Sequence, residues 1–248
     1  MRLRIVTISS VLVALALPLM AQTPAPPAEP PKPTSGNVNV GLALASGNTD
    51  TSTFTAGYEV KYDPKTKNVF KSTGLFLYGQ TEGETTAEQY GLTFRDEYAL
   101  TPRAFVYGDF RYLHDRFKGI SYLLSPTAGA GYKVVDVPST QLALSAGAGL
   151  VTEKDYGFDL QTSGAVTFDE KFSHKLTATA TAGQTISGLW KTSDFGDALY
   201  AFGLNLTASI TSLAQLKLEL LDTYKTKLPD PALEKNDVLF IMSVVFKF

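Results

Sequence analysis

Apolar and polar residues alternate along most of the chain beyond residue 36. In FTAGYEVKY, residues 54–62, every second residue is apolar or aromatic, and the residues between them are Thr, Gly, Glu and Lys. The segment YAFGLNLTASI, residues 200–210, repeats this pattern with mostly small or polar residues on its second face. A period of two residues predicts half-buried β-strands rather than helices.

The same pattern predicts about twelve strands of roughly ten residues, the length that a tilted strand needs to cross a bilayer. The third and fifth alternate poorly, so the facing of their residues follows less directly from the pattern. The expected strands are residues 37–46, 52–62, 69–80, 88–100, 104–114, 122–134, 140–151, 158–168, 174–186, 198–210, 214–225 and 237–248.

The residues on the two faces favour a membrane protein. In a soluble sandwich the polar face meets bulk water, whereas in a membrane barrel the apolar face meets lipid and the polar face lines the lumen. Here the polar face is rich in Gly, Ser, Thr and Asn, which suit a narrow lumen. We therefore expect an all-β, transmembrane, antiparallel up-and-down barrel. The charged residues expected to line its lumen are Glu59, Lys61, Arg95, Glu97, Asp109, Arg111 and Lys133.

The connections between expected strands alternate in length. Those after odd strands, such as TEGETTA and SGLWKTSDFGD, are longer on average than TPR, VDVPS, DEKFS and TSLA, which follow even strands. Outer-membrane barrels have short periplasmic turns and longer outer loops. With both termini in the periplasm, odd connections would be outer loops. No long loop stands out as a constriction or plug.

The N-terminus resembles an export signal. Arg2 and Arg4 precede a short apolar run, and Ala21 offers a cleavage site, as in a secretory signal peptide. A proline-rich stretch follows and is typical of a stiff tether. We expect a signal peptide at residues 1–21, a linker at 22–35 and the barrel at 36–248.

The composition argues against one class of partner and against disulfide bonds. The 248 residues carry a formal net charge of −2 and include no cysteine. A nucleic-acid partner is not expected, because no basic patch has the required charge excess. Without disulfides, export is inferred from the signal alone.

The stretch SGNTDT lies between the first two expected strands. Gly47 and Asn48 tolerate the positive φ of a tight turn, while Thr49 and Asp50 can bond their own backbone. We interpret it as an outer hairpin turn rather than a metal or ligand site.

Three stretches together resemble a known family: the N-terminal signal, GLALASGNTDTSTFTAGYEVKY at residues 41–62, and FIMSVVFKF at residues 240–248. From about residue 36 onward, the chain is similar to the uncharacterised outer-membrane β-barrel family that includes the salt-induced outer membrane proteins. The resemblance implies a Gram-negative outer membrane, with lipid and lipopolysaccharide around the barrel. It supplies no substrate, reaction or catalytic residue.

The last strand also looks like the C-terminal signal that such barrels present to the barrel assembly machinery. One of its faces is apolar and ends on an aromatic residue; it comprises Phe240, Met242, Val244, Phe246 and Phe248. In a soluble protein such an edge would promote aggregation, whereas a closed barrel pairs it with the first strand.

Few residues suggest catalysis. His114 and Asp115 are adjacent, so on a strand they point to opposite faces, and no serine lies in a nucleophile motif. No cluster has transition-metal spacing, and Trp190 suits an aromatic belt at the membrane surface. We predict no catalytic, cofactor or metal residue.

At about twelve strands the lumen lies between a filled eight-stranded barrel and an open porin. The expected function is therefore a structural or narrow-pore envelope protein without enzymatic activity. Two alternatives are a rim-active hydrolase that uses His114 and a soluble secreted β-barrel that binds lipid. The sequence does not predict the oligomeric state.

Overall fold

The computed structural model describes residues 33–46, 51–81 and 84–248. It contains a closed barrel of twelve antiparallel strands, as the alternation predicts. Within these residues no helix is long and apolar enough to cross a membrane. The strands are β1 (Thr34–Ser46), β2 (Thr51–Tyr62), β3 (Asn68–Thr81), β4 (Glu84–Ala99), β5 (Ala104–Asp115), β6 (Ile120–Val137), β7 (Thr140–Asp155), β8 (Gln161–Lys175), β9 (Ala180–Lys191), β10 (Asp194–Ser209), β11 (Ala214–Lys225) and β12 (Asn236–Lys247).

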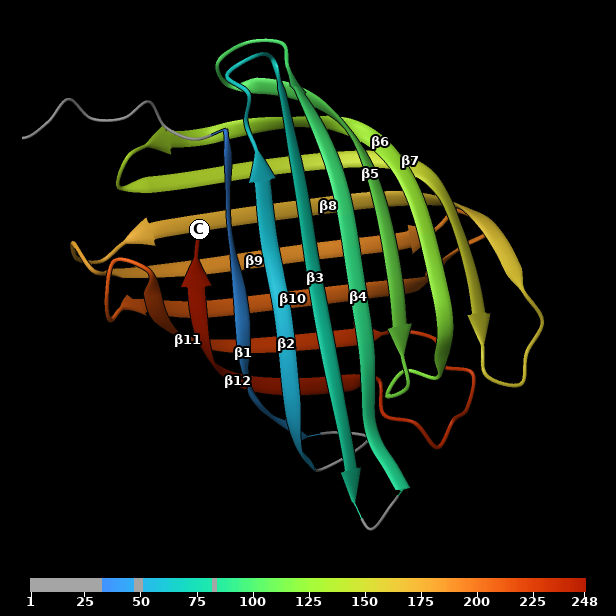
Figure 1. The fold of residues 1–248 in the computed structure, drawn as a ribbon. Helices are drawn as coiled ribbons and strands as arrows, with labels where there is room; N and C mark the ends of the chain where they lie inside the picture. Colours follow the sequence, from blue (N-terminus) through green and yellow to red (C-terminus); the bar gives the residue numbers. More distant parts are fainter. Residues whose placement is uncertain (1–32, 47–50, 82–83) are drawn as a thin grey trace, which may run out of the picture. The chain divides into compact units, whose positions relative to one another are not determined.

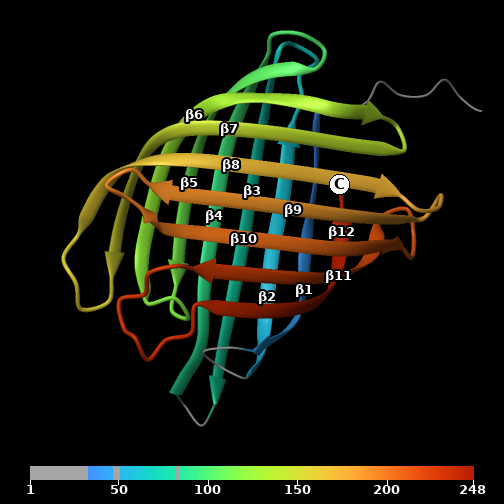
Figure 2. The same ribbon diagram turned by 180° about the vertical axis from the view of Figure 1, so that it is seen from behind.

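Each strand pairs with its neighbours in sequence, and β1 pairs with β12 to close the barrel. The backbones of Gly36 and Phe248 exchange two hydrogen bonds of 3.1 Å across this seam. In Figure 1, β1 to β5 cross in front of β8 to β11, and Figure 2 shows the same crossing from behind. The seam leaves no free edge on β12, so its apolar face does not become an exposed sheet edge.

The apolar face of the sheet points outward. Alternate residues of β12 are exposed: Phe240 is 43 % exposed and Phe246 is 50 % exposed, whereas Leu239 and Ile241 on either side of Phe240 are each 2 % exposed. Val38, Phe54, Phe94 and Leu204 are likewise exposed on other strands. A soluble barrel that binds lipid in its interior would have its apolar face inside. Here the apolar face is outside, as in a wall that faces hydrocarbon.

The register fixes the facing of the two strands that alternate poorly. On β3, Phe70 and Phe76 face outward, whereas Leu77 faces the lumen and is buried. On β5, Phe105 and Tyr107 are buried in the lumen, while Val106 and Phe110 lie on the outer wall. Aromatic residues on both faces hid the period of two.

The expected turn DEKFS is wrong. Residues 169–173 lie inside β8, and the turn to β9 falls at residues 176–179. Asp169 and Lys171 have the composition of a turn, but they face the lumen, where Asp169 pairs with arginines. Charges that line a polar lumen therefore resemble a turn in the sequence.

We call the end of the barrel that carries the start of β1 and the end of β12 the terminal end, and the opposite end the loop end. The expected contrast in connection length is largely absent among the described residues. At the loop end, residues 116–119, 156–160 and 192–193 form short connections, and residues 226–235 form a long one. Strands that extend beyond their expected ends take up the remaining residues.

Some predicted segments lie outside the described residues. These are the expected signal peptide, the linker up to residue 32, and the hairpin residues Gly47, Asn48, Thr49 and Asp50. β1 begins at Thr34 rather than at residue 37, because Thr34 and Ser35 already pair with Tyr62 and Lys61 of β2.

Candidate functional site

The turn between β5 and β6 folds into the lumen at the loop end. Phe117 is 5 % exposed and packs in an apolar cluster with Ala43, Leu77, Leu239 and Ile241, which come from three strands of the wall. Gly119 makes this turn possible, because its φ of +70° is one that glycine adopts without strain. We call residues 116–119 the plug.

Polar contacts anchor the plug on both sides. The Lys118 side chain is fully buried; its Nζ lies 2.6 Å from Asp237 Oδ2 on β12 and donates to the backbone oxygen of Lys235 at 2.8 Å. The Lys118 backbone N–H donates to Asp115, which also accepts a hydrogen bond from Gln89 at 2.8 Å. The ammonium group therefore has partners that offset part of its desolvation cost.

The long connection at residues 226–235 covers the plug. A Cβ atom on Gly119 would lie 2.6 Å from Pro229 Cγ and 3.1 Å from Leu233 Cδ1, so the two loops are in close contact. Figure 1 shows both loops together at the loop end of the barrel. No side chain larger than glycine fits at this contact without displacement.

A second cluster fills the lumen beside the plug. Ile120, Leu123, Val151, Ala165 and Leu189 are each at most 2 % exposed and pack together. Next to them, Glu153 bonds the ammonium groups of Lys225 and Lys191, the latter at 2.7 Å. Apolar packing and buried ion pairs together close the loop end.

The rest of the lumen is polar and hollow. A cavity of ≈ 300 Å³ is lined by residues from eight strands, and it reaches the plug region at Gln89 and Leu221. A second cavity of ≈ 230 Å³ shares Thr73, Thr93 and Arg111 with the first. We call the two together the polar chamber.

Ion pairs cross the polar chamber between opposite walls. Arg111 of β5 lies 3.3 Å from Asp169 of β8, and Arg95 of β4 lies 3.7 Å from the same carboxylate. Arg95 also contacts Glu97 at 3.1 Å and lies 3.6 Å from the centroid of the Tyr107 ring. These contacts narrow the lumen to a constriction that contains charges of both signs.

The structure places the predicted lumen residues as follows. Arg95, Glu97, Asp109 and Arg111 line the polar chamber. Glu59 also lines it, with half of its side chain exposed and Lys217 at 3.9 Å.

The remaining two predicted lumen residues lie near the terminal end. Lys61 is two residues after Glu59 on the same face and pairs with Asp63, and Lys133 pairs with Asp136 at 3.4 Å. The alternation did not find Lys71, Asp169 or Lys171, because β3 alternates poorly and β8 was misplaced. It also missed Phe117 and Lys118, which have the composition of an ordinary loop.

His114 does not form a base–nucleophile pair among the described residues. Its Nδ1 lies 2.7 Å from the backbone oxygen of Ser121, which can only accept, so Nδ1 is the donor. The ring stacks on Tyr90 at 5.0 Å on the outer wall, while Asp115 faces the lumen. Within the described residues, no group of three or more His, Asp or Glu side chains could hold a metal ion.

Aromatic residues gather on the outer wall near the loop end. Trp190 Nε1 donates to the Tyr200 hydroxyl at 3.0 Å, and the two rings meet edge to face at 5.6 Å. Tyr90, His114 and Tyr156 form a second group. Amphipathic rings at this level are typical of an aromatic girdle at a membrane surface.

Solved structures similar to this one are outer-membrane barrels. The chain is similar to the NanC porin with a TM-score of 0.59 and 10% identity, over 85% of this chain and 100% of that chain. It is similar to the COG4313 outer membrane channel from Pseudomonas putida F1 with a TM-score of 0.52 and 12% identity, over 92% of this chain and 100% of that chain. It is also similar to the translocator domain of the autotransporter NalP from Neisseria meningitidis, with a TM-score of 0.51 and 10% identity, over 88% of this chain and 90% of that chain.

The fold is therefore that of an outer-membrane β-barrel of the porin or channel type. A family model, described as protein of unknown function DUF481, matches residues 38–248, and the chain belongs to that family. No curated protein matches the sequence.

Proposed function

We propose that this protein is a non-enzymatic outer-membrane barrel that forms a narrow pore for small solutes or ions, and that the plug closes this pore at the loop end. The observation that carries the proposal is the position of the plug. It lies directly against a polar chamber, and it is a short turn rather than part of the barrel wall.

The two halves of the lumen support this division of roles. The loop end is sealed by Phe117 and its apolar neighbours, whereas the chamber contains cavities large enough for water and exposed charges such as Glu59. A barrel that served only as a scaffold could fill its whole lumen with side chains, as eight-stranded barrels do. Charges lining a chamber set the selectivity of a pore once it opens.

Movement of the plug requires only a few contacts with the barrel wall to break. The turn leaves the lumen if Phe117 leaves its cluster and Lys118 exchanges Asp237 for water. Ordering and release of a short segment is a common way in which proteins switch between two states. The backbone hydrogen bonds from Arg116 to Glu88 of β4 and from Tyr156 to Gly119 would break as well, while the wall strands stay paired with one another.

The absence of activity is part of the proposal. It is supported by the geometry of His114, whose ring donates to a backbone oxygen and has Asp115 on the opposite face of the wall. A hydrolase would need a nucleophile within hydrogen-bond reach of that ring.

Orientation and export also belong to the proposal. With the terminal end in the periplasm, the plug closes the outer mouth, and residues 1–21 act as the export signal. The narrower kinship with the salt-induced outer membrane proteins is supported by the stretch SGNTDT and the last strand.

We further propose that the outward face of β12 is what the assembly machinery binds. Met242 and Phe248 on this face are 49 % and 59 % exposed. Phe248→Ala should lower the amount of folded barrel in cells while leaving refolding of the purified chain into lipid unchanged. Equal losses in both settings would assign Phe248 to stability instead.

The pore is tested by conductance in a planar bilayer. The wild-type barrel should be closed most of the time, and Phe117→Gly/Lys118→Gly should give frequent discrete steps. A double substitution at the exposed loop residues Thr192 and Ser193, also to Gly, is the matched control. If the plug variant is folded and inserted but silent, the protein has a structural role and is not a pore.

A further inference from the structure

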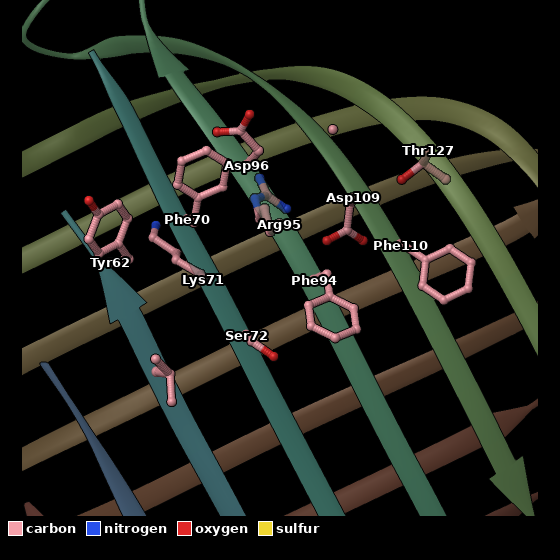
Figure 3. A pocket seen from close by; sticks show the side chains of 12 residues that line it. Tyr62, Phe70, Lys71, Ser72, Phe94, Arg95, Asp96, Asp109, Phe110 and Thr127 are labelled. Carbon is pink, nitrogen blue, oxygen red and sulfur yellow. The ribbon is translucent and has the colours of Figure 1, made fainter. Parts of the chain in front are cut away.

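The outer wall carries a groove near the terminal end that the pore does not use. It has a volume of ≈ 470 Å³ and is lined by Phe70, Phe94 and Phe110 on the outer face of β3, β4 and β5. Figure 3 shows Phe94 and Phe110 on either side of the space between β4 and β5, with Asp96 further toward the terminal end. The volume lies within the range of roughly 300–1,000 Å³ for small-molecule sites.

Gly108 gives the groove its depth. It pairs with Asp96 on β4 and with Ala128 on β6, and a Cβ atom placed on it would meet nothing within 4 Å. Every larger residue at this position would fill part of the groove. The depression therefore depends on the lack of a side chain at one position of the wall.

Asp96 is an anion on a wall that faces lipid. Asn68 Nδ2 donates to both of its carboxylate oxygens, at 3.0 and 3.2 Å. Among the described residues, no Lys or Arg forms a salt bridge with it. A carboxylate has about four acceptor positions, so Asp96 keeps capacity for a further donor. An acid at this place costs free energy unless a cation from the surroundings pairs with it.

A cation lies next to this acid on the barrel. Lys67 precedes Asn68, and its backbone oxygen accepts a hydrogen bond of 2.8 Å from Ala99, three residues after Asp96. The Lys67 ammonium group lies 5.7 Å from the centroid of the Tyr98 ring, at the edge of the wall. The groove thus has an anion in its lining, and a cation lies on the neighbouring turn beyond the groove.

We propose that this groove binds one glycerophospholipid with a primary ammonium headgroup. An acyl chain lies over Gly108 between Phe94 and Phe110. The ammonium group of the lipid pairs with Asp96, and its phosphate pairs with Lys67. The expected orientation of the barrel places the groove in the periplasmic leaflet, which consists of phospholipid. The inference rests on the lipid-facing wall and on the orientation given in the proposed function, and not on the pore.

Native mass spectrometry of the purified, folded barrel tests the proposal. Phosphatidylethanolamine and phosphatidylglycerol of equal chain length are added at equal concentration. The wild type should retain one phosphatidylethanolamine about tenfold more than phosphatidylglycerol, the ratio expected for one charge-assisted hydrogen bond. Equal retention of the two lipids, or none, would overturn the proposal.

Three variants separate the contacts. Asp96→Asn should bring the ratio of the two lipids close to one. Lys67→Gln should weaken both lipids alike, because both carry the phosphate. Gly108→Leu should remove both, since leucine fills the groove. Folding of each variant is checked by its gel mobility before and after heating.

Ala148→Leu is the matched control for Gly108→Leu. Ala148 pairs with Ala128, which pairs with Gly108, so it lies at the same level of the wall but outside the groove. This variant should bind lipid as the wild type does. If Gly108→Leu leaves the lipid ratio unchanged, or abolishes a dimer instead of a lipid adduct, the groove is not a lipid site.

Discussion

The ammonium group of Lys118 lies 2.6 Å from the carboxylate of Asp237 with both side chains buried, so one ion pair joins a four-residue turn to the last strand of the barrel. The pair anchors the plug, which closes the loop end together with two apolar clusters and the ion pairs of Glu153. It also links closure to a contact that a single substitution breaks.

Removing one partner of this pair should destabilise the barrel. Asp237→Leu leaves Lys118 as an unpaired buried charge, which costs about 3–5 kcal/mol when the charge stays buried. Lys118→Met/Asp237→Leu should recover most of the loss, because an apolar pair replaces the ion pair. Urea unfolding followed by the fluorescence of Trp190 measures both. If the double variant is less stable than either single variant, the pair is not coupled as described.

Asp169 should control ion selectivity once the plug is removed. It pairs with both Arg95 and Arg111, so Asp169→Asn removes the carboxylate partner of Arg111 at the constriction and leaves Arg95 with Glu97 alone. In the Phe117→Gly/Lys118→Gly background, the reversal potential in a salt gradient should shift toward anions. Asp136→Asn, which removes the partner of Lys133 at the terminal end, is the control and should shift it less. Equal shifts would place the constriction elsewhere.

The turn between β2 and β3 should lose stability in acid. Hydrogen bonds from Lys61 and Lys65 lower the pKa of Asp63 to about 2. Because the folded pKa lies below the ordinary value of 3.8, the contribution is complete above that value and disappears as pH falls toward 2. Asp63→Asn should therefore lower the free energy of unfolding at pH 7, measured by urea titration, by less than about 1 kcal/mol. At pH 2 the variant and the wild type should have the same midpoint, and a constant difference would contradict the assignment.

The seam between β1 and β12 should not tolerate a side chain at Gly41. A Cβ atom there would lie 2.7 Å from the Ser243 Cα atom and closer still to the Met242 backbone oxygen. Gly41→Val should cost about 1–3 kcal/mol through strain. Gly108→Ala, where a Cβ atom meets nothing within 4 Å, is the control. The fraction of chain with folded gel mobility should fall only for Gly41→Val; an equal effect of both would show that the seam is not the cause.

The sequence was sufficient for the strand count and for the facing of strands with clean alternation. Outward residues of β12 such as Phe240 and Phe246 follow directly from the period of two. The alternation also selected Arg95, Glu97, Asp109 and Arg111, which the structure places around one chamber.

The contacts between residues inside the lumen could not be predicted from the sequence, for a physical reason. Strand tilt and stagger decide which residues of distant strands lie at the same height, and neither is encoded in the period of two. Asp169 meets Arg95 across the chamber although they are far apart in sequence. Phe117 and Lys118 follow a strand end and have loop composition, so nothing in the pattern indicates that they turn inward.

The central claim is that Phe117 closes the lumen at the loop end, and the absence of native cysteine allows a direct measurement. Ala43 is fully buried in the cluster beneath Phe117 and can be replaced by cysteine with little change in volume. With Ala43→Cys, a water-soluble maleimide added from outside should react slowly, and Phe117→Ala should accelerate labelling at least about tenfold, the change given by a closing free energy of about 1.4 kcal/mol. Ser193→Cys, exposed at the same end, should react rapidly in both backgrounds. If cysteine at position 43 reacts as rapidly with Phe117 present as without it, the plug does not close the barrel.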